Sequence, residues 1–307
     1  MRVLVTGANG FLGRGLAPAL ADRFGGLTRL VLTDVAFTVK TPAGADTVEG
    51  DLGDTGFLKA LFESGFDLVF HLASVPGALA ERAPELGYRI NLTTPLCLAR
   101  RLTSIRPGAR FIFASSVAVY GNLDGQTVTE DTTLDPLLSY GAHKRMVEIF
   151  LSDMTRRREL SAISLRFPGL VARPPTQSGH GSAFMSLIFH KIAAGEAYEC
   201  PVPASAYCWW MSRKAAVSAL LHAAAIDSAS STVVQPPVLH GTIGDVAAAV
   251  SRVTGQQAWI EWGNDTQLTR LFGAMPPLDA AASLGLGFCA DADMGALAHA
   301  AFEGDLS

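Results

Sequence analysis

The feature that most restricts the fold of this chain is the glycine-spaced turn "VTGANGFLG" near its N-terminus. It follows a β-branched run and puts Gly7, Gly10 and Gly13 where a buried strand gives way to a helix. Gly7 permits a tight turn, Gly10 lets a ligand approach the backbone, and Gly13 lets the helix pack closely. The segment therefore predicts the first strand–turn–helix unit of a parallel α/β sheet.

Short apolar runs alternate with longer helical segments after this turn. The expected strands cover residues 29–34, 46–52, 66–74, 109–116 and 161–169, and the expected helices cover 81–104 and 140–159. Such alternation is typical of βαβ units with right-handed crossovers. We therefore expect an α/β fold, with a doubly wound Rossmann sheet over residues 1–170. A smaller lobe would cover 171–307, with some of its segments returning to the sheet.

The amino-acid composition of the chain changes after the last of these strands. Residues 171–184 are rich in Pro, Gly and Ser, which is typical of a loop. Beyond them we expect helices near 184–195, from Arg213 and at 243–253, and strands near 207–210 and 233–239. Loops at the carboxyl edge of a parallel sheet form the ligand sites of α/β proteins, so we expect the second lobe to bind the substrate.

The glycine turn has the chemistry of a dinucleotide site. A helix N-terminus offers free N–H groups and a partial positive charge to a pyrophosphate. Asp34 ends the second strand, where its carboxylate can accept hydrogen bonds from an adenosine ribose and would repel a 2′-phosphate. No Lys or Arg follows it before Lys40, so NAD is favoured over NADP and residues 1–170 become the NAD-binding domain. A turn that serves only close packing is the alternative.

Other residues of this half are expected around the same cofactor. Asp51 could bind the adenine amino group, with Leu52 against the ring, or could only cap a helix. Small residues end the fourth strand and would let its backbone lie against a ribose, whereas His71 is expected in the core. The expected cofactor contacts in this half are Gly7, Asn9, Gly10, Phe11, Leu12, Gly13, Asp34, Asp51, Leu52, Leu72, Ala73 and Ser74.

A tyrosine and a lysine share one helical face in "SYGAHK", because Tyr140 and Lys144 are one turn apart. A phenol with its ordinary pKa of about 10 is a poor base at neutral pH, and a neighbouring ammonium favours its anion. The anion can take a proton from an alcohol as hydride leaves carbon. Lys144 can also bond the nicotinamide ribose. Ser116, at the end of the fifth strand, can hold the substrate oxygen.

This Tyr–Lys spacing by itself is common on surface helices. The dinucleotide turn and a serine at a strand end favour the catalytic interpretation of the three side chains. Their helical neighbours His143, Arg145 and Glu148 are expected on other faces of the helix, in solvent.

The motifs "TGANGFLG", "GDL", "HLAS", "ASSVAVYG", "SYGAHK" and "LRFPG" follow one another in the order and spacing of a known family. Over residues 1–170 the chain resembles the extended short-chain dehydrogenase/reductases, which include nucleotide-sugar epimerases and dehydratases. The resemblance implies a Rossmann domain with bound NAD(H) and a catalytic set of Ser116, Tyr140 and Lys144. It also implies that Asn91 supports the active-site geometry and that Pro168 lies near the nicotinamide. Asn91, Tyr140, Lys144 and Pro168 therefore join the expected cofactor contacts.

The C-terminal half favours a small substrate. Nucleotide-sugar members of the family usually carry an arginine that grips the diphosphate, whereas "AYCWWMSRKAAV" has none at that point, and Trp209 and Trp210 take up space. The segments "CPVP", "AAVSALLHAA" and "LRFPGLVARP" look most like the branch of the family that oxidises D-erythronate, a small sugar acid, with NAD.

A small hydroxy acid needs a cation or N–H donors for its carboxylate. Arg173, His180 and Ser182 are candidates, although Arg173 could instead bond loop carbonyls. The expected substrate contacts are Ser74, Ser116, Tyr140, Arg173 and Ser182.

The sequence therefore predicts NAD-dependent oxidation of a secondary hydroxyl of a small sugar acid, with D-erythronate to 2-oxo-erythronate as the first candidate. A nucleotide-sugar epimerase or dehydratase with tightly bound NAD is the alternative. A non-catalytic NAD-sensing protein is a third possibility, but such proteins usually lose the tyrosine or the lysine, and both are present here.

Composition argues against other classes of partner. The formal net charge is −4 without a long block of like charges, so no nucleic-acid or membrane partner is expected. The cysteines show no CxxC spacing, which predicts free thiols in the cytoplasm and no metal site. A homodimer is expected, because related enzymes pair the Tyr-bearing helix with its neighbour in a four-helix bundle. The apolar positions that could serve the core or that interface are Met146, Val147, Phe150 and Leu151.

Overall fold

The computed structural model of this chain describes residues 1–23, 27–63, 65–123, 125–175, 182–226 and 232–303, which form two compact units. The first unit combines Met1–Val119, Leu138–Arg166 and Val217–Gln235. The second unit combines Tyr120–Leu137, Phe167–Ala216 and Pro236–Ser307. The predicted division at residue 170 is simpler than this one, because the chain passes between the units repeatedly.

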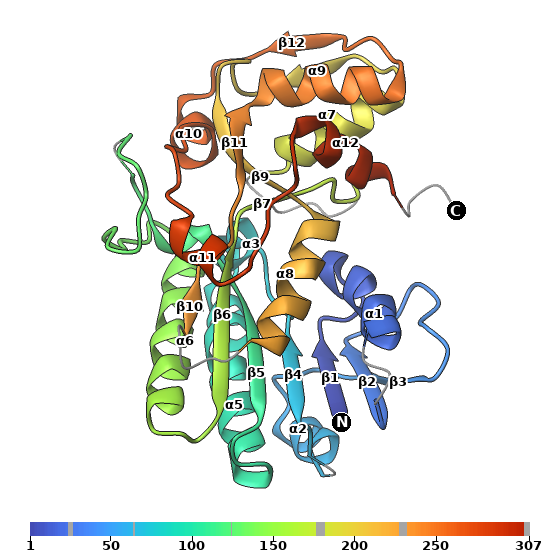
Figure 1. The fold of residues 1–307 in the computed structure, drawn as a ribbon, viewed down its shortest axis with the longest axis vertical. Coiled ribbons are helices and arrows are strands. Elements are labelled where there is room, and N and C mark those ends of the chain that lie inside the picture. The colour runs from blue at the N-terminus through green and yellow to red at the C-terminus, as the bar shows by residue number, and fades with distance from the viewer. Residues whose placement is uncertain (24–26, 64, 124, 176–181, 227–231, 304–307) are drawn as a thin grey trace. The chain divides into compact units, whose positions relative to one another are not determined.

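The first unit is built on a seven-stranded sheet with the order β10-β6-β5-β4-β1-β2-β3 (Figure 1). Its strands are β1 (Arg2–Thr6), β2 (Arg29–Asp34), β3 (Ala45–Glu49), β4 (Leu68–His71), β5 (Arg110–Ser116), β6 (Ser161–Phe167) and β10 (Val233–Val234). The strands pair in parallel. The chain winds from β1 to β3 in one direction and from β4 to β6 in the other, which confirms the predicted doubly wound Rossmann sheet. The switch point lies between β1 and β4.

Burial explains why these segments form strands. β1, β4 and β5 have continuous apolar runs, and Leu4, Phe70 and Phe113 within them are 0% exposed. Strands that are covered on both faces need such runs rather than an alternating pattern. β3, at the edge of the sheet, carries mainly exposed residues instead. Leu102 and Leu151 pack from two helices into the same core as Phe111.

Helices flank this sheet (Figure 1). They are α1 (Phe11–Arg23), α2 (Thr55–Leu61), α3 (Gly77–Arg82), α4 (Pro84–Tyr88), α5 (Thr94–Ile105), α6 (Ser139–Arg156) and most of α8 (Arg213–Ala225). α6 agrees closely with the predicted helix 140–159, because its apolar positions recur with helical spacing and Val147 and Leu151 enter the core.

The predicted single helix 81–104 is wrong in detail. The segment forms α3, α4, a π-helical turn at Arg89–Thr93, and then α5. Pro84 opens α4, and Pro95 has no N–H to offer the carbonyl of Asn91. The π turn spreads the helix at that point, and such turns are frequent at functional sites. Asn91 lies inside it and is 1% exposed.

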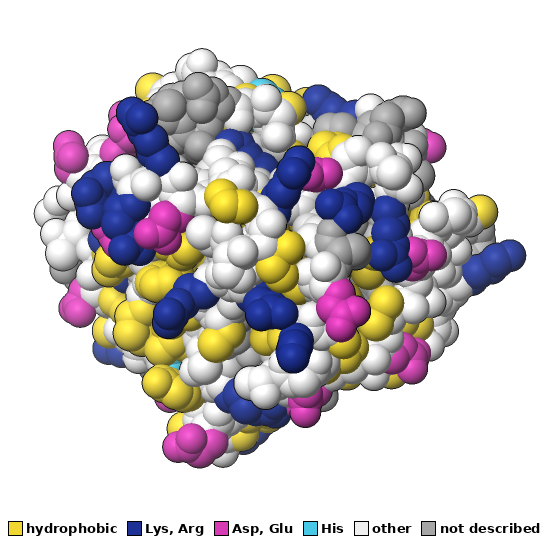
Figure 2. All heavy atoms as spheres, turned by 90° about the horizontal axis from the view of Figure 1, so that it is seen from below, with side chains coloured by type: hydrophobic (Ala, Val, Ile, Leu, Met, Phe, Trp, Pro, Cys, Tyr) yellow, Lys and Arg dark blue, Asp and Glu magenta, His cyan; other side chains and the backbone are white. Residues whose placement is uncertain are grey.

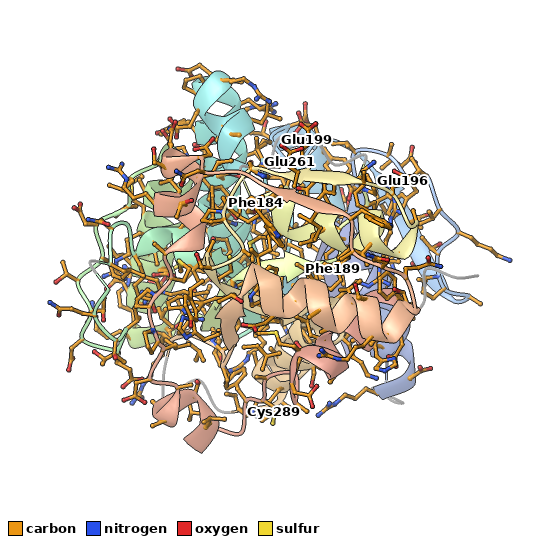
Figure 3. The ribbon with its side chains drawn as sticks, turned by 90° about the horizontal axis from the view of Figure 1, so that it is seen from above. Phe184, Phe189, Glu196, Glu199, Glu261 and Cys289 are labelled. Carbon is orange, nitrogen blue, oxygen red and sulfur yellow. The ribbon has the colours of Figure 1, made fainter. Side chains whose placement is uncertain are left out.

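The second unit holds a three-stranded sheet of order β11-β9-β7 and a two-stranded sheet of β12 and β8. These strands are β7 (Gly169–Val171), β8 (Tyr198–Cys200), β9 (Tyr207–Ser212), β11 (Leu239–Thr242) and β12 (Ile260–Trp262). The longer helices are α7 (Phe184–Ala193), α9 (Ile243–Thr254) and α12 (Met294–Phe302), and the shorter ones are α10 (Thr266–Leu268) and α11 (Ala281–Gly285). Phe184 and Phe189 of α7, labelled in Figure 3, are buried in the core of this unit.

The predicted strand 233–239 is two strands. β10 joins the first unit's sheet and β11 joins the second unit's sheet. Pro236 and Pro237 stand between them, and neither has an N–H to donate to a strand ladder. β7, β8 and β12 were not expected, because runs of three residues are too short to show a pattern.

Candidate active site

The glycine turn joins β1 to α1 at the switch point of the sheet. Gly7 has a φ of 68°, and a Cβ there would lie 2.6 Å from the backbone nitrogen of Ala73. A Cβ at Gly13 would lie 2.4 Å from the Gly7 carbonyl oxygen. Among the atoms of the described residues, a Cβ at Gly10 would meet only that same oxygen, at 3.2 Å. The chain's own packing therefore requires glycine at 7 and 13, whereas the space over Gly10 fits the close approach of a pyrophosphate.

Asp34 stands beside this turn. Its carboxylate accepts the backbone N–H groups of Asn9 at 2.9 Å and Val35 at 2.8 Å. Arg14 was not expected at this turn; its guanidinium donates to the Asn9 carbonyl at 2.7 Å and to Thr38 Oγ1 at 2.9 Å. The backbone of Asn9 is thus held between the Asp34 carboxylate and the Arg14 guanidinium. Arg14 directly follows the third glycine of the motif, which is the signal that could have revealed it.

Asp51 has two hydrogen-bond partners within the chain. Its carboxylate accepts a hydrogen bond from Arg89 at 2.6 Å and one from the Gly53 N–H at 2.7 Å. The Arg89 bond, followed by the Gly53 bond, holds the pKa of Asp51 below its usual value. The alternative that Asp51 caps a helix is wrong, because Asp54 caps α2 through the Phe57 N–H. An adenine amino group at Asp51 would share the carboxylate with Arg89.

The buried side chain of Asn91 holds the loop after β4 through hydrogen bonds. Asn91 Oδ1 accepts the Ser74 hydroxyl at 3.0 Å and the Val75 N–H at 2.8 Å, and Asn91 Nδ2 donates to the Val75 carbonyl at 2.9 Å. Asn91 therefore holds the backbone at the end of the segment Leu72, Ala73 and Ser74. Ser74 itself is exposed.

His71, at the end of β4, is a core residue as predicted. It is 1% exposed, and its Nδ1 lies 2.7 Å from Thr6 Oγ1. Burial, followed by the charge of Lys144, lowers the pKa of His71 to about 3. The ring is therefore neutral at physiological pH. Its Nε2 has no hydrogen-bond partner among the described residues, so only one of the two ring nitrogens forms a hydrogen bond there.

Tyr140 and Lys144 lie on the same side of α6. Lys144 is 2% exposed and its Nζ donates to the Ala114 carbonyl at 2.7 Å. The same Nζ lies 5.4 Å from the centre of the Tyr140 ring and 4.6 Å from that of Phe113. Burial lowers the pKa of Lys144 to about 7, against the opposing charge of Glu148. Ser116 ends β5, two residues beyond Ala114, and is half-buried.

The expectation that the other polar residues of this helix are solvated is wrong for two of them. His143 is 8% exposed and Glu148 is 0% exposed. Burial, more than any charge, lowers the pKa of His143. Glu148 lies on the same face as Lys144, one turn further along. That spacing is the signal that could have revealed it.

The second unit contains the remaining predicted residues. Pro168, the residue that links β6 to β7 in the chain, is buried, and Ser182 is half-buried just before α7. Arg173 follows β7, where its N–H donates to Ser186 Oγ at 3.0 Å and its carbonyl oxygen lies 2.7 Å from His190 Nε2. His180 lies outside the described residues.

Trp209 and Trp210 belong to the core of the second unit. They are 1% and 0% exposed, and their indole N–H groups donate to the carbonyls of Pro276 at 2.7 Å and Gly241 at 3.0 Å. The bulk of these two side chains is thus used in packing. The expectation that they take up substrate space has no support in the structure.

The described residues contain no group of three or more His, Cys, Asp or Glu side chains that could hold a metal ion. Cys97, Cys200, Cys208 and Cys289 are free thiols. None of the helices formed by the described residues is long and apolar enough to cross a membrane. Figure 2 shows basic, acidic and apolar side chains interspersed on one face of the molecule.

Comparison with known proteins places these motifs in context. A family model described as "NAD dependent epimerase/dehydratase family" matches residues 3–233. A D-erythronate dehydrogenase from Cupriavidus necator is 33% identical, over 99% of this chain and 98% of that protein. A D-erythronate dehydrogenase from Haemophilus influenzae is 29% identical, over 95% and 96%. The crystal structure of a nucleoside-diphosphate-sugar epimerase from Agrobacterium tumefaciens superposes with a TM-score of 0.87 at 29% identity, covering 100% of this chain and 94% of that one.

Proposed function

The chain belongs to the NAD dependent epimerase/dehydratase family, and from that premise we propose that it oxidises a secondary hydroxyl of a small sugar acid. As an NAD-dependent oxidoreductase of this family, it would use Ser116, Tyr140 and Lys144 as its catalytic residues. D-Erythronate is the first candidate substrate and 2-oxo-erythronate the product.

The observation that carries this proposal is the anchored lysine beside the tyrosine. Lys144 is fully enclosed, tied to the Ala114 carbonyl at 2.7 Å, and its Nζ lies 5.4 Å from the centre of the Tyr140 ring. A buried ammonium costs free energy unless it is paired and hydrogen-bonded, so a buried lysine beside a tyrosine indicates a function. Its position next to a phenol, at the carboxyl end of β5, suits a proton transfer rather than packing.

Each side chain has a distinct task in the reaction. Bound NAD supplies the acceptor for the hydride that leaves the alcohol carbon. The Tyr140 phenolate takes the hydroxyl proton as the carbonyl forms. The Lys144 ammonium stabilises that phenolate, and Ser116 Oγ donates a hydrogen bond to the substrate oxygen.

The turn around Gly10 supports NAD binding, because open space over a glycine at a helix N-terminus fits a pyrophosphate. Asp34 would accept the ribose hydroxyls in addition to its two backbone bonds. For the substrate, the support is the nearly full-length likeness to two D-erythronate dehydrogenases. We further propose that Arg173 and Ser182 bind the substrate carboxylate.

A substrate screen tests the proposed function. The purified protein is mixed with NAD and a panel of small sugar acids, and NADH absorbance is followed. Sustained NADH formation with D-erythronate is expected. Absence of NADH with every acid in the panel would contradict the proposal.

Matched tyrosine variants test the assignment of the base. Tyr140→Phe should lower kcat by about a hundredfold or more, because general-base catalysis contributes about that much. Tyr207→Phe changes an exposed tyrosine of the second unit and should leave kcat unchanged. Equal activity of the two variants would exclude Tyr140 as the base.

A nucleotide-sugar epimerase or dehydratase with tightly bound NAD is the alternative function. The TM-score of 0.87 with a nucleoside-diphosphate-sugar epimerase favours it, and the burial of Trp209 and Trp210 removes one argument against it. Such an enzyme would bind a UDP- or dTDP-sugar tightly and convert it without net NADH. Calorimetric titration with UDP-glucose separates the two, because a small-acid dehydrogenase would give no binding heat.

We also propose that the protein is a homodimer that pairs through α6. Val147 and Leu151 are core residues and Phe150 packs against the core, but Met146 and Ile149 are 43% and 53% exposed on the same helix. A second copy would cover these apolar side chains. Light scattering should give twice the chain mass, and Ile149→Lys should give a monomer. A monomeric wild-type protein would overturn the assignment.

A further inference from the structure

Glu148 is a carboxylate enclosed within the sheet and helices of the first unit. Its Oε1 accepts the Ser115 hydroxyl at 2.6 Å and Arg166 Nε at 3.0 Å, and its Oε2 accepts Arg166 Nη2 at 2.9 Å and Arg145 Nη1 at 3.3 Å. It is 0% exposed. Ser115 lies on β5 and Arg166 on β6, so this one carboxylate joins α6 to two neighbouring strands.

The same stretch of β5 holds the reactive groups. The Ala114 carbonyl accepts the Lys144 ammonium, the Ser115 hydroxyl donates to Glu148, and Ser116 offers its hydroxyl to the substrate. Two bonds from α6, one turn apart, therefore reach adjacent residues of the strand. A shift of α6 along β5 would lengthen both bonds, so they set the position of Tyr140 relative to Ser116.

Stability alone does not account for this arrangement. Two buried charges lose hydration energy that their attraction only partly restores, and well-packed apolar residues often replace such a pair without loss of stability. The Glu148–Arg166 pair is bidentate and almost wholly buried, with side-chain exposures of 0% and 10%. Such a pair is explained if it fixes the position of neighbouring Lys144 or provides a negative charge close to it.

We propose that Glu148 is a positioning residue of the active site, which fixes α6 on β5 through Ser115 and Arg166 and holds a negative charge one helical turn from Lys144. This inference rests on the proposed function, in which Lys144 assists Tyr140. Glu148 does not touch the substrate in this proposal. It acts through Lys144 and through the strand that carries Ser116.

The charges around Lys144 agree with this role. Tyr140, His143 and Glu148 face it from α6, and His71 faces it from β4. Burial lowers the pKa of His71 and that of His143, so neither adds a positive charge at physiological pH.

Glu148 is therefore the anionic group of this set. Burial lowers the pKa of Lys144 to about 7, and the Glu148 charge opposes that effect. Arg145 and Arg166 reduce the field of Glu148 without cancelling it. Loss of the carboxylate charge should lower the pKa of Lys144 further.

The first test measures Lys144 directly in the cofactor-free protein. The side-chain signals of ¹³C-labelled lysines are followed by NMR against pH, and a Lys144→Arg variant identifies the Lys144 signal. In Glu148→Gln the Lys144 midpoint should fall by about one pH unit. Asp153→Asn removes an exposed carboxylate from the same helix and should leave the midpoint unchanged. An unchanged midpoint in folded Glu148→Gln would overturn the proposal.

A double variant keeps the proposal testable if Glu148→Gln does not fold. Glu148→Met combined with Arg166→Met replaces the ion pair with an apolar pair of similar volume. The folded double variant should show the same downward shift of the Lys144 midpoint. It should also show a kcat lowered about tenfold or more with little change in KM, because the reactive groups are misplaced rather than the substrate site. A wild-type midpoint together with a wild-type kcat in the double variant would refute the positioning role.

The two proposals fail separately. The lysine titration needs neither cofactor nor substrate, so a downward shift supports the role of Glu148 even if the substrate screen is negative. A positive substrate screen with no shift in Glu148→Gln would leave the dehydrogenase assignment intact and remove the inference about Glu148.

Discussion

Glu81 Oε1 accepts the backbone N–H of Ser139 at 2.7 Å, so a carboxylate from α3 caps the helix that carries the reactive tyrosine. Leu138, the residue at the N-cap position, offers no side-chain hydrogen bond of its own. A helix N-terminus has unsatisfied N–H groups and a partial positive charge, and both favour an acid there. Tyr140 directly follows the capped Ser139, so the cap holds the backbone that carries the Tyr140 side chain.

We expect Glu81→Ala to lower the free energy of unfolding by about 1 kcal/mol, the usual effect of losing a helix cap. It should also lower kcat, because the first turn of α6 would fray around Tyr140. Urea unfolding and steady-state kinetics measure the two effects. Glu85→Ala removes an exposed acid from the adjacent helix and serves as the control. Equal losses in the two variants would show that the cap has no special role.

Arg14 should matter for cofactor affinity although it was not expected at the site. Its hydrogen bonds to Asn9 and Thr38 hold the loop after β2 against the glycine turn. Arg14→Leu should weaken NAD binding about tenfold, as expected for the loss of charge-assisted hydrogen bonds. Arg23→Leu, in the last turn of the same helix, is the control. Fluorescence titration with NAD checks both, and unchanged affinity in Arg14→Leu would exclude a role for the loop.

The Asp34 carboxylate should weaken NADP binding. The Arg14 cation should determine how much NADP affinity is gained when that carboxylate is removed. Asp34→Asn removes the charge that repels a 2′-phosphate, while Arg14 remains beside it as a cation. NADP affinity should therefore rise in Asp34→Asn and rise less in the Asp34→Asn, Arg14→Leu double variant. The same NADP affinity in both would mean that Arg14 does not reach the phosphate.

Lys144 should make stability depend on pH in a defined direction. Burial lowers its pKa in the folded protein to about 7 from the ordinary value of 10.5. Between these values the unfolded chain holds a proton that the folded protein lacks, so the free energy of unfolding rises with pH. The contribution has a limiting slope of about 1.4 kcal/mol per pH unit. Lys144→Met should lose that slope while remaining folded. Parallel stability curves for the two proteins would contradict the pKa of about 7.

Two glutamates stand opposite one another in the second unit. Glu199 of β8 and Glu261 of β12 are paired in register, and both are exposed and labelled in Figure 3. Like charges at neighbouring strand positions destabilise a sheet by about 0.2 to 1 kcal/mol. Glu261→Thr should therefore raise the melting temperature at low salt. The gain should shrink in concentrated NaCl, where the repulsion is screened. A gain that is independent of salt would point to strand propensity instead.

Local patterns were sufficient for much of the site. A glycine-spaced turn after β1 predicts a phosphate-binding geometry because its requirements lie within a few residues. The spacing of Tyr140 and Lys144 predicts a shared face because a helix repeats every 3.6 residues. Most strands of the first unit were expected for the same reason, since a continuous apolar run indicates a covered strand. The prediction of a single helix over 81–104 was wrong because the sequence does not show how the chain adjusts to Pro95. The π turn before Pro95 is held by the contacts of Asn91 with Ser74 and Val75.

The sequence by itself determined the alternating strands and helices of the first unit, the glycine turn and the tyrosine–lysine pair, because each of these shows in a pattern of neighbouring residues. Only the tertiary structure decided that Glu148 is enclosed between Ser115 and Arg166, and that Arg14 reaches Thr38. Those contacts join segments that fold against each other from distant positions. The burial of a charged side chain depends on which surfaces meet, so helical spacing can mark Glu148 as a candidate but cannot state which residues enclose it.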